Sequence, residues 1–254
     1  NQAVRDRVNG INSAGLVTGY RGSPLGGVDA TFTKAEKFLK KKNIKFQYGL
    51  NEDLAATAIW GSQQTELRNE GKYDGVFGLW YGKGPGVDRC GDVFRHSNLA
   101  GTSKYGGVLV AMGDDHSAES STELHQSEYA LVDAMMPILS PAGVQDILDF
   151  GIKGWALSRY SGLWVGIKCL KDTIEVTEVI DASYDRVKIV DPKDRDHEEL
   201  NIRLGDTPPA REDRLHNKKL RAAKIFARAN NVNRVDYSPA EKNIGIISAG
   251  KSWL

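Results

Sequence analysis

Residues 15–27 read G-L-V-T-G-Y-R-G-S-P-L-G-G, and the rest of the fold can be predicted outward from them. The stretch begins with a short apolar run over residues 16–18 that is typical of a buried strand. It continues into a turn, and the whole stretch holds five glycines, one proline and one arginine. Because ordering glycine costs conformational entropy, such a turn indicates that another group approaches the backbone closely.

Strand-like runs and helix-like segments alternate along the chain. The strand-like runs cover residues 16–18, 45–48, 75–81, 107–112, 136–139 and 163–169. The helix-like segments between them cover residues 28–41, 53–69, 87–99, 126–134 and 144–158. This alternation predicts an α/β fold, a doubly wound and mainly parallel sheet with helices on both faces. Ligands of such sheets bind at the carboxyl ends of the strands.

Composition places the chain among ordinary soluble proteins. It has 254 residues, of which 40% are hydrophobic and 26% charged, and its net charge of +1 points to no polyanionic partner. The two cysteines, Cys90 and Cys169, form no disulfide framework and no metal or cluster spacing, which indicates packed thiols in a reducing, cytoplasmic setting. No signal peptide or membrane span is visible in the sequence.

The character of the sequence changes after about residue 184. We predict an α/β domain over residues 1–184, a charged connector over 185–241 and the first strand of a following domain over 242–254. Residues 214–231 are typical of a basic amphipathic helix, for which a solvated connector face is favoured over nucleic-acid or membrane binding. We interpret the chain as a piece of a longer protein.

Two loops at predicted strand ends carry candidate site residues. In the first loop Arg21 offers a planar donor fork for a carboxylate and Ser23 a hydroxyl before a proline, although a plain strand-to-helix turn explains it equally well. In the second, Asn51 is a good helix N-cap, and Glu52 and Asp53 favour the positive end of a helix dipole. That explanation is complete unless a ligand needs a carboxylate there.

Two further loops follow the next strands. Residues 82–87 read G-K-G-P-G-V, whose amides could cradle an anion, although the glycine spacing is that of neither a P-loop nor a dinucleotide fingerprint. Asp114, Asp115 and His116 lie in a dense polar stretch. Adjacent ligands on one loop rarely fit one metal site, so this stretch is either a substrate-facing loop or an ordinary surface loop.

Five longer motifs together resemble a known family. In chain order they are G-Y-R-G-S-P-L-G-G, N-E-D-L-A-A-T-A-I-W-G-S-Q-Q, K-Y-D-G-V-F-G-L-W-Y-G-K-G-P-G-V-D-R, H-S-N-L-A-G-T-S and G-D-D-H-S-A-E-S-S. They resemble the amino-terminal region of indolepyruvate ferredoxin oxidoreductases, in particular the large fused bacterial type of the 2-oxoacid:ferredoxin oxidoreductase family. The resemblance covers most of the chain and extends to D-T-P-P, R-L-H-N-K-K-L and I-I-S-A-G-K-S-W-L.

The resemblance implies a thiamine diphosphate enzyme, with residues 1–184 as its pyrimidine-binding domain. Such enzymes decarboxylate a 2-oxo acid, pass two electrons through [4Fe-4S] clusters to ferredoxin and release an acyl-CoA. The implied partners are an aryl 2-oxo acid such as indolepyruvate, coenzyme A and ferredoxin, with no nucleic acid and no membrane. A homodimer is implied, with the site completed by a diphosphate-binding domain. The G-D-G motif for Mg2+ and the cluster cysteines are absent here, so other parts must bind both groups.

The resemblance also assigns roles to residues. Glu52 matches the glutamate that hydrogen-bonds N1′ of the cofactor's pyrimidine and thereby helps its 4′-amino group to take the C2 proton. Ser23 and Arg21 match positions near the substrate carboxylate, and Asp114, Asp115 and His116 fall in a substrate-contacting loop. The cofactor-binding positions are Gly22, Pro24, Glu52, Gly84 and Gly86. An arginine found in some pyruvate-specific relatives is missing, which favours a bulkier substrate.

Two alternatives remain open from the sequence. One is a non-oxidative thiamine diphosphate decarboxylase or transketolase-like enzyme, and the other is a non-catalytic assembly subunit. Glu52 argues against the second, because such a subunit needs no acid at that position. Trp60 and Trp80 are expected in the core, and His96 and Asn98 on the face of the domain.

Overall fold

The computed structural model describes residues 1–119, 122–193, 199–241 and 243–254. Six strands form one sheet in the order β2-β1-β3-β4-β6-β5, and every neighbouring pair is parallel. The strands are β1 (Ser13–Gly19), β2 (Ile44–Tyr48), β3 (Gly75–Lys83), β4 (Val108–Asp114), β5 (Ile138–Leu139) and β6 (Trp164–Leu170). The predicted doubly wound α/β fold is confirmed.

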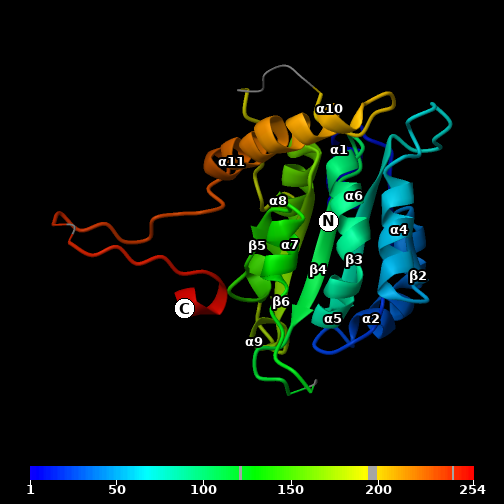
Figure 1. The fold of residues 1–254 in the computed structure, drawn as a ribbon. Helices are drawn as coiled ribbons and strands as arrows, with labels where there is room; N and C mark the ends of the chain where they lie inside the picture. The colour runs from blue at the N-terminus through cyan, green and yellow to red at the C-terminus, as the bar shows by residue number, and fades with distance from the viewer. Residues whose placement is uncertain (120–121, 194–198, 242) are drawn as a thin grey trace.

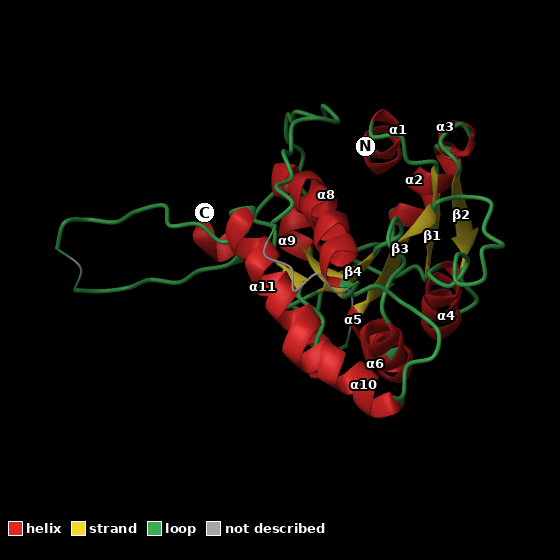
Figure 2. Ribbon diagram, turned by 90° about the horizontal axis from the view of Figure 1, so that it is seen from above, coloured by secondary structure: helices red, strands yellow, loops and turns green. Residues whose placement is uncertain are grey.

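Helices cover both faces of the sheet, as Figure 2 shows from above. The helices of the α/β unit are α1 (Gln2–Val8), α2 (Val28–Lys34), α3 (Glu36–Lys40), α4 (Glu52–Ser62), α5 (Gly84–Arg89), α6 (Gly91–Ala100), α7 (Glu128–Asp133), α8 (Val144–Ser161) and α9 (Lys171–Ile174). Helices α4 to α7 pack against one face, and α2, α8 and α9 against the other (Figure 1). Every described strand is therefore covered on at least one side.

Alternation along β4 shows how the sequence builds these two faces. Val108, Val110 and Met112 point into the cluster under α4 to α7, whereas Leu109 and Ala111 point into the clusters on the other face. Successive side chains of a strand point to opposite sides, so a strand buried on both faces is apolar throughout. All seven residues of β4 are buried.

Two predicted helices are split in the structure. The segment predicted over residues 28–41 forms α2 and α3, where Thr31 and Thr33 bond back to the carbonyls of Gly27 and Asp29, a bond that bends helices. The segment predicted over 87–99 forms α5 and α6. It starts earlier than predicted, at Gly84, because Pro85 suits the first turn of a helix. The helix predicted over 53–69 ends at Ser62, and α1 was not predicted.

The segment predicted as a connector packs on the α/β unit. It contains α10 (Pro208–Asp213), a π-helical turn (Arg214–Lys219) and α11 (Leu220–Ala229), which together lie across the end of the sheet where the strands begin (Figure 1). Leu215 and Phe226 join Tyr160 of α8 in one apolar cluster. The basic helix α11 thus buries its apolar side, and this segment joins the core of the α/β unit.

The strand predicted at the end of the chain does not form among the residues that the structure describes. Residues 243–249 have no regular structure, and Gly250–Trp253 forms a 3-10 helix. Ile244, Ile246 and Ile247 are exposed. A strand needs a neighbour that shares its backbone hydrogen bonds, and residues 243–249 make none with the other described residues.

Candidate functional site

The predicted site residues follow the carboxyl ends of β1, β2, β3 and β4. β1 connects to β2 through α2 and α3 on one face, and β2 connects to β3 through α4 on the other, although β2 and β3 lie on opposite sides of β1. The strand order therefore reverses beside β1, and a reversal of this kind opens a crevice for ligands at the carboxyl ends of the strands. These ends lie at the bottom of Figure 1.

Glu52 is the first residue of α4 at this reversal. The preceding Asn51 caps the helix, since its side-chain oxygen accepts a hydrogen bond from the backbone N–H of Leu54 at 2.8 Å. The Glu52 side chain is half-buried. Within the described ranges, no side chain donates a hydrogen bond to its carboxylate or forms an ion pair with it. A carboxylate on a helix start, oriented but unpaired, is free to receive a ligand's donor.

Gly86 forms the surface on which the Glu52 side chain lies. A Cβ at Gly86 would stand 2.5 Å from Cγ and 2.8 Å from Oε1 of Glu52. Both distances are far inside van der Waals contact, so only glycine leaves room for the carboxylate at this position. Gly86 belongs to the first turn of α5, directly after β3. The second and third predicted loops therefore meet.

The glycine-rich loop after β1 lies against the ends of β3 and β4. A Cβ at Gly22 would be 3.0 Å from Cβ of Lys83, and one at Gly113 would be 3.1 Å from both Pro24 and Leu25. Leu25 is buried and anchors the loop, whereas Ser23 is half-buried and Arg21 exposed. The Ser23–Pro24 peptide bond is cis. The loop thus reaches from β1 across to β4, with its polar groups outward.

Asp114 and Asp115 hold the fourth loop in shape. Asp114 is fully buried at the end of β4, and its two oxygens accept hydrogen bonds from the hydroxyl (2.6 Å) and backbone N–H (2.9 Å) of Ser127. Asp115 is also buried and accepts from the backbone N–H of Ser117 at 3.3 Å. Of the three predicted residues in this loop, His116 alone is exposed, and its Nδ1 lies 3.1 Å from the carbonyl of His125.

Sequence analysis gave His125 no role, although it belongs to the same cluster. Its Nε2 lies 2.9 Å from the Asp88 carboxylate and its Nδ1 3.6 Å from that of Asp114. A Cβ at Gly84 would stand 2.1 Å from Nδ1, so the imidazole lies directly on that glycine. Gly84 and Gly86 each make room for one side chain, His125 and Glu52 respectively. No local motif could have revealed this, because the contact joins the loop after β4 to the start of α5.

The other residues singled out in the sequence are structural. Trp80 is fully buried, Trp60 is half-buried against the exposed His96, and Asn98 is fully buried. Asn98 does not line the face of the domain: its amide donates to the carbonyl of Ala134 at 2.7 Å and accepts from the backbone N–H of Trp164 at 2.9 Å.

Both cysteines are free and buried, as predicted. Burial, followed by the carboxylates of Asp53 and Glu52, raises the pKa of the Cys90 thiol, and burial raises the pKa of Cys169 to about 12. Neither thiol is therefore a nucleophile at neutral pH.

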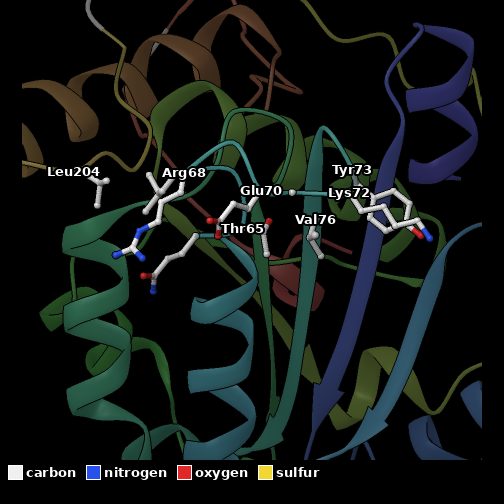
Figure 3. Close-up of a pocket in the computed structure, with 10 residues that line it drawn as sticks. Thr65, Arg68, Glu70, Lys72, Tyr73, Val76 and Leu204 are labelled. Atoms are coloured by element: carbon white, nitrogen blue, oxygen red, sulfur yellow. The ribbon is translucent and has the colours of Figure 1, made fainter.

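A cavity lies at the opposite end of the sheet from these loops. Its volume is about 550 Å3, and its lining comes from the loop between α4 and β3, from Val76 near the start of β3 and from Leu204 (Figure 3). Arg68, Glu70 and Lys72 line its polar part. Because β3 begins at this end, the cavity is separated from Glu52 by the length of the strand and belongs to no predicted site.

The residues present fit the pyrimidine half of thiamine diphosphate. The fit rests on one free carboxylate, Glu52, over a glycine cradle that a Cβ would fill. No group of three or more histidine, cysteine, aspartate or glutamate side chains within the described parts of the chain could hold a metal ion. No described helix is both long enough and apolar enough to cross a membrane.

The fold and this site define a doubly wound α/β domain consistent with the pyrimidine-binding domain of thiamine diphosphate enzymes. Two curated proteins named indolepyruvate oxidoreductase subunit IorA are homologous to the chain. The one from Methanothermobacter marburgensis is 24% identical over 251 residues, which are 99% of this chain and 38% of that protein. The one from Methanothermobacter thermautotrophicus is 22% identical over 245 residues, 95% of this chain and 37% of that protein. No family model matches the chain.

These relatives confirm the resemblance that the motifs indicated. The chain spans less than two fifths of the length of either relative. Their names support a role connected with an oxidoreductase that is assembled from more than one part.

Proposed function

We propose that this chain forms the pyrimidine-binding part of a thiamine diphosphate-dependent oxidoreductase. The whole enzyme would convert an aryl 2-oxo acid such as indolepyruvate and coenzyme A to an acyl-CoA and CO2, with ferredoxin as electron acceptor. The observation that carries the proposal is the unpaired Glu52 carboxylate, held at a helix start against Gly86. The names of these relatives support the substrate class.

Glu52 would bind and activate the cofactor. When bound, thiamine diphosphate would supply the nucleophilic carbon that decarboxylation of a 2-oxo acid requires. Glu52 would share a proton with N1′ of the pyrimidine ring and so make the 4′-amino group basic. A positioned proton-transfer group of this kind contributes on the order of 10²–10⁴ in rate. Gly22, Pro24, Gly84 and Gly86 would bring the backbone close to the ring.

The residues around Glu52 would orient the substrate. Arg21 and Ser23 would bind its carboxylate, since a guanidinium fork and a hydroxyl both donate to such a group. His116 is the exposed member of the fourth loop and would contact the substrate directly. Asp114 and Asp115 would act by holding that loop, because their carboxylates are buried on Ser127 and Ser117.

Other parts of the enzyme would complete the site. Leu50 and Leu54 flank Glu52 and are 85% and 52% exposed, an apolar surface that suits a docking domain. That domain would bind the diphosphate and Mg2+, within a homodimer, and further parts would hold the [4Fe-4S] clusters. We place the enzyme in the cytoplasm, because its two thiols are free and buried.

The test is Glu52→Gln in the full-length protein. Gln keeps the size of the side chain but cannot share a proton, so we expect turnover to fall by about 10²–10⁴ while cofactor binding persists. Turnover is measured as ferredoxin reduction that depends on both 2-oxo acid and coenzyme A. Asp53→Asn is the control, because Asp53 is the adjacent carboxylate and makes only a loose pair with Arg89 at 3.9 Å. Equal turnover of the two variants would refute the role of Glu52.

A further inference from the structure

Trp80 joins β3 to the residue that carries the candidate catalytic carboxylate. Its indole Nε1–H donates a hydrogen bond to the backbone carbonyl of Glu52 at 3.0 Å. Trp80 has no exposed surface and comes from the strand next to the glycine-rich loop. The Glu52 carbonyl belongs to the first turn of α4, so this bond ties that turn to the neighbouring strand β3.

The indole itself is held from two sides. Its ring meets Phe94 edge to face, with centroids 5.1 Å apart and an interplanar angle of 84°. A Cβ at Gly82 would stand 2.4 Å from the indole ring, so the ring lies directly on that glycine. Close packing of this kind leaves the ring one orientation, and its N–H one direction.

One continuous segment, residues 80–86, therefore contacts both the backbone and the side chain of Glu52. Trp80 of β3 holds its backbone, and Gly86 of α5 forms the surface under its side chain. We propose that Trp80 is a positioning residue that sets the direction of the Glu52 carboxylate toward the cofactor. This inference rests on the proposed function, since it assumes that Glu52 acts on N1′.

The test removes the indole N–H and leaves the ring. Trp80→Phe in the full-length protein deletes the donor, and β-(3-benzothienyl)alanine at the same position deletes it without changing the volume. A 1 Å displacement of a reacting group can cost about 100-fold. Loss of one hydrogen bond allows less movement than that, and we expect exchange of the thiamine C2 proton with solvent deuterium to slow by about 5- to 20-fold. KM for the 2-oxo acid should change by less than about 2-fold, because Trp80 does not reach the substrate.

Trp155→Phe is a matched control. The Trp155 indole also donates to a backbone carbonyl, that of Gly78 in β3 at 2.9 Å, but it comes from α8 on the other face of the sheet from α4. Both substitutions should lower stability to a similar degree, and Trp80→Phe alone should slow C2 exchange. If both variants, or the benzothienyl form, exchange at the parent rate, Trp80 is only a core residue.

A double variant separates this inference from the proposed function. If Trp80 acts through Glu52, then Trp80→Phe should slow exchange in the parent but have no further effect in the Glu52→Gln background. An equal effect in both backgrounds would overturn the positioning role. If Glu52→Gln itself exchanges at the parent rate, the proposed function fails. If Glu52→Gln slows exchange and Trp80→Phe does not, only the role of Trp80 fails.

Discussion

Gly86→Ala is the sharpest perturbation that the site offers. The new Cβ would lie 2.5 Å from Cγ and 2.8 Å from Oε1 of Glu52. Carbon atoms in contact stand about 3.5–4.0 Å apart, so the Glu52 side chain must withdraw by roughly 1 Å. Gly86 is helical and has no positive φ, so the alanine backbone itself is unstrained. The substitution therefore moves the carboxylate and little else.

The expected result is a large kinetic effect with a modest effect on stability. A shift of about 1 Å in a reacting group can cost about 100-fold, and we expect C2-proton exchange and turnover of the full-length enzyme to fall by that order. Overpacking should lower the free energy of unfolding by about 1–3 kcal/mol, measured by urea denaturation. Deuterium exchange at C2 of the bound cofactor is the decisive assay, because it reports proton removal without the later steps.

Gly61→Ala is the control for this experiment. Gly61 lies in α4, and a Cβ there meets nothing within 4 Å. Alanine is favoured over glycine inside a helix by up to about 1 kcal/mol, so this variant should be at least as stable as the parent and equally active. If Gly86→Ala also keeps the parent's exchange rate while being folded, the contact between Gly86 and Glu52 has no part in catalysis.

Three further predictions concern the body of the domain. Asp6→Asn should lower the free energy of unfolding by about 3 kcal/mol in urea titrations, because the Arg159 guanidinium, 15% exposed and bonded to both oxygens of the buried Asp6 at 2.6 and 2.9 Å, loses its counter-charge. The pKa of Lys219 is lowered to about 7, chiefly by burial, so between pH 7 and 10 the unfolded state binds more protons than the folded state, and stability should rise by up to about 1.4 kcal/mol per pH unit. Lys219→Met should remove that part of the slope, and an unchanged slope would contradict the assignment. Cys90 and Cys169 should react with a thiol reagent only at the rate of unfolding; rapid labelling of the native protein would show that they are accessible.

The sheet could be predicted because its central strands β3, β4 and β6 are apolar runs, which can be recognised without knowing their neighbours. Residues 75–81 and 163–169 were recognisable as strands from their own side chains. The sequence was less informative where contacts with distant segments decide whether a helix or strand forms. Residues 243–249, predicted as part of a strand, have no regular structure, because they share no backbone hydrogen bonds with the other described residues. The helix α1 is short, and Arg5 attaches it to the carbonyls of Tyr184 and Val187, residues far away in sequence.

The candidate site, like the fold, could be predicted only in part from the sequence. Glu52 could be proposed from the sequence because its loop carries both a cap and a motif. His125 and Trp80 could not, because their significance depends on contacts between β3, β4 and α4. Asp114 illustrates the opposite case. Its type and position suggest a ligand contact, yet tertiary packing uses both of its oxygens to hold Ser127.

The packing of α11 against α8 determines how the protein responds to proteolysis and to truncation. Tyr160 and Phe226 stand 5.5 Å apart ring to ring, and Leu200 and Leu215 cover the same surface. A protease that cleaves in the exposed stretch near Tyr184 would nick the chain without releasing either piece. A polypeptide that stopped there would leave this apolar surface open to water and prone to self-association. The smallest portion able to fold cooperatively therefore extends past Phe226, and the two pieces of a nicked molecule should melt in a single transition.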